Sequence, residues 1–151
     1  MKHRIEIKEP FQVIGRTMRM SEAEEFWHDI GGMWKEWNDN GMTKKMAKYS
    51  ADEIGHDLDV SFVSPTEKDP ASFTYTVGVR YNGAENANGY DIIAIPGGKY
   101  AVFDVPKEEA DDIGNFMGKI IDFLPTAGYE RVGVDIEYFK GDACEVWELI
   151  K

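Results

Sequence analysis

The carboxyl-terminal segment Ala143–Ile150 places an acidic side chain among aromatic and aliphatic ones. Alternation along a strand puts Glu145 and Trp147 on one face, and both faces of this segment are mainly apolar. A carboxylate in apolar surroundings costs free energy unless a positive charge compensates it. Two interpretations follow. Either Glu145 meets water or pairs with Arg80, Arg131 or a lysine, or it is the counter-charge for a cationic ligand.

Aromatic side chains that suit a cationic ligand are abundant. The chain has four Trp, seven Tyr and eight Phe, together 13% of its residues. The face of an aromatic ring attracts a cation, so Trp34, Trp37, Tyr75 and Trp147 are candidate walls of a binding pocket. Ordinary core packing is the alternative, and it is favoured by the helical spacing of Trp27, Ile30, Trp34 and Trp37.

Other chemistries find little support. The three histidines fall in separate predicted elements, and no H-x-x-x-H or C-x-x-C spacing occurs, so neither a metal site nor a cofactor is predicted. We interpret His56–Asp59 as an exposed strand end. Cys144 is interpreted as a core residue, because its acidic neighbour Glu145 disfavours the thiolate. Gly97–Gly98 interrupts a strand pattern, which indicates a bulge or a close backbone approach.

Composition bounds the class of protein. A length of 151 residues favours one domain. A formal net charge of −11 disfavours direct binding to nucleic-acid phosphates. No apolar run reaches the length of about 18 residues that a membrane span requires. The amino terminus lacks an apolar signal core, so a cytoplasmic protein is expected.

The elements that must position these residues follow the order β-α-β-β twice. Residues 4–20 indicate a strand pair or one bent strand, broken at Pro10. A helix is predicted from Ser21, which forms a capping-box pattern with Glu24. Strands are predicted at 58–62, 73–81, 91–105 (broken at Pro96), 132–139 and 143–150, and a second helix from Pro106 to Pro125. The pattern predicts an α+β domain over 1–151 with modules at 1–82 and 90–151. Six strands form one antiparallel sheet with two main helices, and a pocket lies at the seam.

Several segments resemble GyrI-like effector-binding domains, also called AraC-type effector-binding domains. In chain order the matching segments are Ile7–Gly15, Ile95–Phe103, Phe123–Pro125 with Gly128–Glu130, Ile136–Tyr138 and Cys144–Trp147. The resemblance covers nearly the whole chain. Phe123, Asp135 and Glu148 depart from the residues that are frequent in the family.

The resemblance implies two modules related by a pseudo-twofold axis, with a ligand pocket between them. It implies that the acidic pocket residue of the family is Glu145. It also carries Trp34, Trp37 and Tyr75 over as pocket walls, and we expect Phe103 of the Ile95–Phe103 motif to line the pocket with them. A free-standing binding protein without its own DNA-recognition helix is expected.

The expected function is therefore the binding of amphipathic or cationic small molecules, which the resemblance links to transcription regulation and multidrug binding. Two alternatives remain open. In the first, the protein hydrolyses electrophilic, cyclopropane-containing cytotoxins with Glu145 as general base and Tyr75 as proton donor. In the second, it is an interaction protein of the gyrase-inhibitor kind that uses the acidic cluster at 108–112. Binding without catalysis is favoured.

Overall fold

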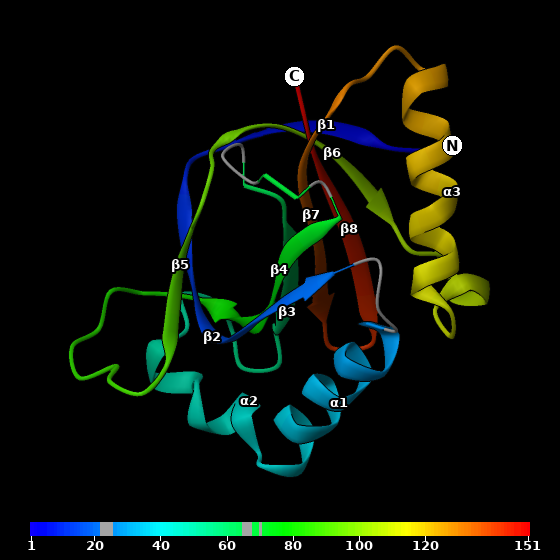
Figure 1. Ribbon diagram of the computed structural model, residues 1–151. Helices are drawn as coiled ribbons and strands as arrows, with labels where there is room; N and C mark the ends of the chain where they lie inside the picture. The colour runs from blue at the N-terminus through cyan, green and yellow to red at the C-terminus, as the bar shows by residue number, and fades with distance from the viewer. Residues whose placement is uncertain (22–25, 65–67, 70) are drawn as a thin grey trace.

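The computed structural model describes residues 1–21, 26–64, 68, 69 and 71–151. These residues form one eight-stranded antiparallel sheet with helices against one of its faces (Figure 1). The strands are β1 (Arg4–Lys8), β2 (Phe11–Ser21), β3 (Leu58–Phe62), β4 (Ser72–Arg80), β5 (Asp91–Ile95), β6 (Gly98–Asp104), β7 (Arg131–Lys140) and β8 (Ala143–Ile150). The helices are α1 (Phe26–Asp39), α2 (Met42–Lys45) and α3 (Ile113–Thr126), with 3-10 turns at Ala47–Tyr49 and Lys107–Glu109. The α+β class and the antiparallel sheet are confirmed.

The sheet has eight strands where the sequence suggested six, because two breaks divide long strands. Pro10 separates β1 from β2, and Pro96 and Gly97 separate β5 from β6. The two breaks touch each other. A Cβ on Gly97 would lie 2.6 Å from the Pro10 ring and 2.8 Å from the carbonyl oxygen of Lys8, so only glycine fits there. This is the close backbone approach that the glycines predicted.

The strand order shows the pseudo-twofold arrangement directly. It runs β1-β6-β8-β7-β3-β4-β2-β5. Each strand of the first half, β1 to β4, occupies the position that mirrors its counterpart in the second half, β5 to β8, counted from the opposite edge of the sheet. The edge strands cross between the halves, since β1 pairs with β6 and β5 pairs with β2. The axis therefore falls between β3 and β7, where Asp59 lies opposite Glu137.

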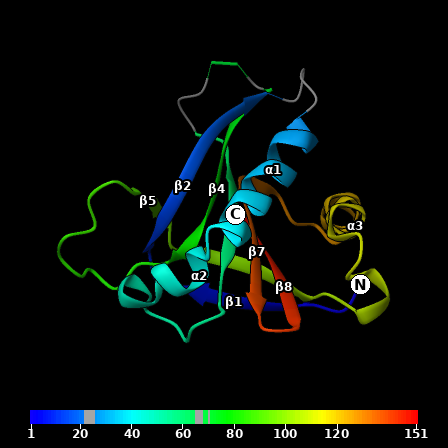
Figure 2. The ribbon, with the colours of Figure 1, turned by 90° about the horizontal axis from the view of Figure 1, so that it is seen from below.

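The two faces of the sheet bury different sets of side chains. The sheet curls around a core that includes Leu58, Ile136 and Trp147. On the opposite face, α1 packs Met33 and Trp37 against β4, and α3 packs Phe116, Ile120 and Leu124 against β6 and β8. Figure 2 shows α1 and α3 as separate rods that do not cross. Among the described residues, no helix is long and apolar enough to cross a membrane.

The ends of the helices differ from the predicted ones. Residues 107–109 after Pro106 form only a 3-10 turn, and α3 begins at Ile113, where the Asp112 carboxylate accepts a hydrogen bond from the Asn115 amide at 3.0 Å. Pro125 lies in the last turn of α3 rather than beyond it. Strand β2 extends through Ser21, and Glu24 of the predicted capping box lies outside the described residues.

Candidate ligand-binding pocket

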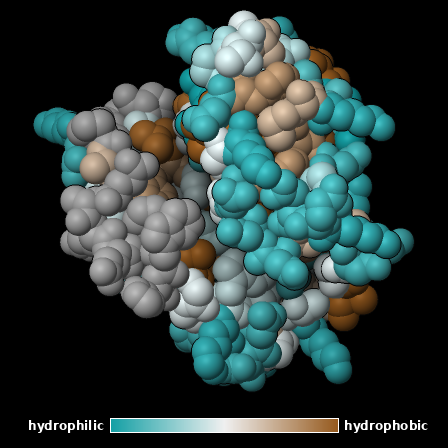
Figure 3. All heavy atoms as spheres, turned by 90° about the vertical axis from the view of Figure 1, so that its right-hand side faces the viewer, coloured by the Kyte–Doolittle hydropathy of each residue, from teal (hydrophilic) through white to brown (hydrophobic). Residues whose placement is uncertain are grey.

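A cavity of about 1110 Å³ lies between the central strands β3, β4 and β7 and the helices α1 and α3. Its volume suits a drug-sized ligand, for which pockets of about 300–1,000 Å³ are typical. Figure 3 shows the side of the molecule that carries α3, where apolar atoms border a hollow. Among the described residues, the aromatic side chains of Trp34, Phe73, Tyr75 and Phe139 line the cavity, and α3 contributes Ile113, Gly114, Met117, Gly118 and Ile121.

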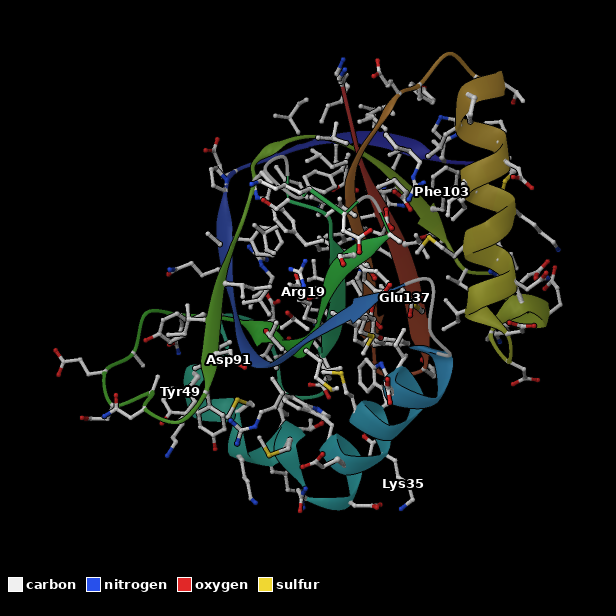
Figure 4. All side chains as sticks on the ribbon, viewed as in Figure 1. Arg19, Lys35, Tyr49, Asp91, Phe103 and Glu137 are labelled. Carbon is white, nitrogen blue, oxygen red and sulfur yellow. The ribbon has the colours of Figure 1, made fainter. Side chains whose placement is uncertain are left out.

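Two carboxyl groups face each other in the floor of this cavity. Asp59 on β3 and Glu137 on β7 are direct cross-strand partners, and both line the cavity. Asp59 is 2% exposed, and Glu137 is half-buried. Figure 4 shows Glu137 in the space between the central strands and the helices. Neither carboxyl forms an ion pair with a basic side chain in the described part of the chain.

The environment of the pair favours its protonated form. Burial, and then the charge of Glu137, raise the pKa of Asp59 well above its ordinary value. Burial also raises the pKa of Glu137, and the neighbouring Asp135 adds to that effect. Both shifts have the physical origin expected for two acids in one low-dielectric site, where one ionised group opposes ionisation of the other.

Hydrogen-bond donors from α1 and β4 reach the same place. The Trp34 indole Nε1 donates to the Tyr75 hydroxyl oxygen at 2.9 Å, and both side chains also interact with the Asp59 carboxyl. The Trp34 ring packs edge-on against Phe139, with ring centroids 5.3 Å apart. Burial and the two nearby acids raise the pKa of Tyr75, so its hydroxyl keeps its proton and can donate it to a hydrogen bond.

A second acidic pair lies beside the first and carries its own counter-charge. Arg131 donates to both oxygens of Asp135, at 2.9 and 3.0 Å, and lies 3.4 Å from the fully buried Glu148. In a regular strand, residues four apart are separated by about 13 Å, too far for this contact. An irregularity in the β7–β8 register around Gly133, whose φ is +93°, breaks that spacing.

A further acid, Asp57, accepts hydrogen bonds from the helical side of the pocket. Its Oδ2 accepts hydrogen bonds from Trp37 Nε1 at 3.1 Å and from Thr43 Oγ1 at 2.5 Å. Trp37 is 2% exposed and therefore packs in the core while it holds Asp57. This hydrogen bond connects the α1–α2 region to the beginning of β3.

The structure brings two of the six predicted site residues together in this pocket. Trp34 and Tyr75 line it and share a hydrogen bond. Trp37 lies next to it, in the contact with Asp57. Trp147 stacks on Tyr138 in the core on the other face of the sheet, and Phe103 packs against α3 (Figure 4). None of these last three belongs to the cavity lining.

Glu145 also lies away from the cavity, and basic side chains neutralise it there. Lys140 Nζ is 2.9 Å from Glu145 Oε1, and the Arg4 guanidinium donates to the other carboxylate oxygen. Burial alone would raise the pKa of Glu145, but Lys140 and Arg4 lower it below its ordinary value of 4.5. A lysine partner was one of the two interpretations of this residue from the sequence. Strand alternation explains this placement. On β8, Glu148 shares the helix-covered face with Val146 and Ile150, and Glu145 lies on the opposite face with Trp147.

We expect Glu145→Gln to reduce stability and leave ligand affinity unchanged. Arg4 and Lys140 are 45% and 44% exposed, so solvent screening limits the loss to about 1 kcal/mol. Because the pKa of Glu145 is lowered on folding, this stabilisation is present above about pH 4.5 and disappears as the pH falls through the lowered pKa. Urea unfolding of both proteins at neutral and acidic pH measures it. If the difference in unfolding free energy between the two proteins were equal at both pH values, the assignment of ion pairs to Glu145 would be contradicted.

Sequence reasoning missed the acids that line the cavity, which among the described residues are Asp57, Asp59, Asp135 and Glu137. The segment His56–Asp59 was interpreted as an exposed strand end, and this was wrong, since Asp57 and Asp59 are 8% and 2% exposed. The signal was present in the alternation of two acids with apolar residues at 57–60, and again in Asp135 and Glu137 around Ile136. The pattern shows which residues share a face, and only the packing of α1 and α3 shows that this face is covered.

Comparison with known families identifies the class of protein. The model of the GyrI-like small molecule binding domain matches residues 1–148, and the chain belongs to this family. A search of curated proteins found no match.

Solved structures share the fold at low sequence identity. SAV2435, solved with tetraphenylphosphonium bound, superposes with a TM-score of 0.83 at 14% identity, over 100% of this chain and 94% of that one. A protein from Staphylococcus aureus MU50, described as a candidate bacterial transcription regulator, gives a TM-score of 0.80 at 16% identity, over 100% and 99%. The C-terminal domain of EcmrR gives 0.57 at 10% identity, over 100% and 99%. At these identities the likeness establishes the fold.

Proposed function

We propose that this protein binds lipophilic organic cations in the cavity between the central strands and helices α1 and α3. Asp59 and Glu137 supply the negative charge, and Trp34, Tyr75 and Phe139 supply aromatic walls. Ile30, Met117 and Ile121 add apolar surface that contacts any lipophilic cation, so several cations of similar size and charge are accommodated. The sequence-based expectations of a cytoplasmic protein that does not itself bind DNA belong to this proposal.

The observation that carries the proposal is a buried carboxyl pair without a basic partner among the described residues, open to an apolar cavity. Burial of such charge is unfavourable in the absence of compensation. A ligand with a delocalised positive charge and an apolar surface compensates the negative charge of the carboxyl pair and packs against the apolar walls of the cavity. The aromatic faces add about 0.5–2 kcal/mol for each ring, depending on how dry the site is.

The comparisons support the same ligand class. The structural neighbour SAV2435 was solved with a lipophilic phosphonium cation. A ligand with about 25 heavy atoms at about 0.3 kcal/mol each gains about 7.5 kcal/mol, which corresponds to a dissociation constant near the micromolar range. We propose no hydrolysis, since Glu145, the residue expected to act as the base, contacts Arg4 and Lys140 outside the cavity.

Isothermal titration of the protein with tetraphenylphosphonium tests the proposal. We expect saturable one-to-one binding with a dissociation constant of about 1–10 μM. Triphenylphosphine oxide, which is neutral and carries the same rings, is expected to bind at least about tenfold more weakly, because it lacks the net charge. Absence of saturation with the cation, or equal affinity for the neutral compound, would refute the proposal.

Gly118 of α3 offers a steric test of the same cavity. A Cβ at this position meets nothing within 4 Å, so Gly118→Leu adds bulk to the cavity wall without a clash in the free protein. We expect it to weaken tetraphenylphosphonium binding by about tenfold or more, since the added volume overlaps the ligand, while the helix itself gains propensity. Asn115→Leu is the matched control, because Asn115 is exposed on the same helix and outside the lining. Equal affinities of the two variants would place the ligand elsewhere.

A further inference from the structure

We propose that Asp59 and Glu137 share one proton in the free protein, and that a bound organic cation takes its place, so that binding releases a proton to the buffer. This inference rests on the proposed function and adds its regulation by pH. It concerns the same cavity but a different quantity, the number of protons exchanged when the ligand binds.

The geometry of the pair favours a shared proton. Asp59 and Glu137 are opposite each other on adjacent antiparallel strands, so their Cβ atoms are about 4.5–5.5 Å apart. Both side chains line the same cavity on the covered face of the sheet, and the buried Asp59 Oδ2 receives no hydrogen bond from a donor in the described part of the chain. A hydrogen bond between two carboxyl groups requires a proton on one of them.

The charged groups that surround the pair also favour a bound proton. The facing ionisable groups are Tyr75 from β4, Asp57 from β3, Asp135 and Arg131 from β7, and Cys144 and Glu148 from β8. Of these only Arg131 is cationic, and Asp135 and Glu148 already engage it. The described lining residues of α1 and α3 carry no ionisable side chain. Within the described part of the chain, therefore, a proton is the available counter-charge for the free pair.

The polar groups of Trp34 and Tyr75 favour one bound proton on the pair rather than two. The Tyr75 oxygen accepts a hydrogen bond from Trp34, which leaves the Tyr75 O–H directed elsewhere as a donor. The nearby polar groups of Tyr75 and Trp34 lower the pKa of Asp59, against the raising effects of burial and Glu137. These donors stabilise a single negative charge on the pair. The free site is then a singly charged acid pair, and an arriving cation makes loss of the remaining proton favourable.

A pH dependence of affinity follows from this exchange. Tetraphenylphosphonium has no titratable group, so any proton released on binding comes from the protein. Below the pKa at which the pair loses its shared proton, affinity for the cation should rise by up to tenfold per pH unit. Above that pKa, affinity should be independent of pH.

Calorimetry in buffers of different ionisation enthalpy measures the proton directly. Titrations with tetraphenylphosphonium are repeated in phosphate and in Tris across about pH 6 to about pH 8.5. We expect release that approaches one proton per ligand at the acidic end and declines as the pH rises. Saturable binding with no buffer dependence anywhere in this range would overturn the inference and leave the proposed function intact.

Two variants assign the proton to the pair. Glu137→Gln leaves Asp59 with its donors from Tyr75 and Trp34, so cation binding should persist within about threefold at neutral pH while proton release disappears. Glu145→Gln makes the same chemical change outside the cavity and should retain the release. Release that survives Glu137→Gln in a folded protein would overturn the assignment.

The free protein gives a test that needs no ligand. Carboxyl carbon NMR of Asp59 and Glu137 should show a high-pH step sensed by both carbons and lost in Glu137→Gln. Two independent titrations in the ordinary carboxyl range would overturn the shared proton. If tetraphenylphosphonium fails to bind while this step is present, the proposed ligand class is wrong and the shared proton remains.

Discussion

The double substitution Asp59→Asn with Glu137→Gln is expected to weaken tetraphenylphosphonium binding by about 100-fold. It removes all negative charge from the central pair while it preserves the volume of both side chains. A hydrogen bond or close contact with a charged group contributes about 1.5–3 kcal/mol, and the larger figure corresponds to about two orders of magnitude in affinity. Titration calorimetry of both proteins measures the loss.

The neutral analogue provides the control for this variant. Triphenylphosphine oxide should bind the double variant about as well as the unmodified protein, because its contacts with the aromatic walls do not change. A parallel loss for both ligands would mean that the substitutions distort the cavity. Unchanged cation affinity would remove Asp59 and Glu137 from the site.

The same double variant should be more stable than the natural sequence at neutral pH. Folding raises the pKa of both acids, so their ionisation opposes folding. This penalty is absent below their ordinary values near about pH 4, grows as the pH rises, and is complete above the raised pKa. The stability difference between the variant and the natural protein should therefore widen from pH 4 to pH 8 in thermal unfolding. Functional acids that lower stability in the absence of ligand are a common compromise.

Arg131→Met is expected to be the most destabilising of the substitutions considered. It leaves Asp135 and the fully buried Glu148 without their cation. Loss of one partner from a buried ion pair costs about 3–5 kcal/mol, and the partial exposure of Arg131 reduces this to about 2–4 kcal/mol. The loss should be smaller near pH 4, where protonation removes the unpaired charge. Denaturant unfolding at both pH values measures it.

A second substitution separates the charge effect from lost packing. Adding Glu148→Gln to Arg131→Met removes one of the stranded carboxylates. The double variant should recover part of the lost stability at neutral pH, a coupling that a double-mutant cycle quantifies. A double variant less stable than Arg131→Met alone would show that packing by the arginine stem, rather than its charge, accounts for the effect.

The sequence by itself determined much of the architecture of this protein. Alternating apolar residues marked the strands, the apolar stripe at Phe116, Ile120 and Leu124 marked α3, and the doubled β-α-β-β order predicted the antiparallel sheet and its pseudo-twofold symmetry. These features follow from local periodicity, which reports which side chains share one face of an element. Trp34 and Tyr75 became pocket candidates through their aromatic side chains and the family resemblance, while periodicity by itself favoured core packing for Trp34.

Tertiary structure alone decided which acid faces the cavity. Periodicity does not tell which face of a strand a helix will cover. Asp59 was therefore assigned to an exposed strand end, and for Glu145 the sequence left pairing with a basic side chain and contact with a ligand both open. Pairing of β3 with β7 across the pseudo-twofold axis sets Asp59 against Glu137, although they are far apart in the chain. Arg4 and Lys140 reach Glu145 only through the pairing of β1 with β6 and the β7–β8 turn. Charge compensation depends on such long-range contacts, which one strand's pattern does not contain.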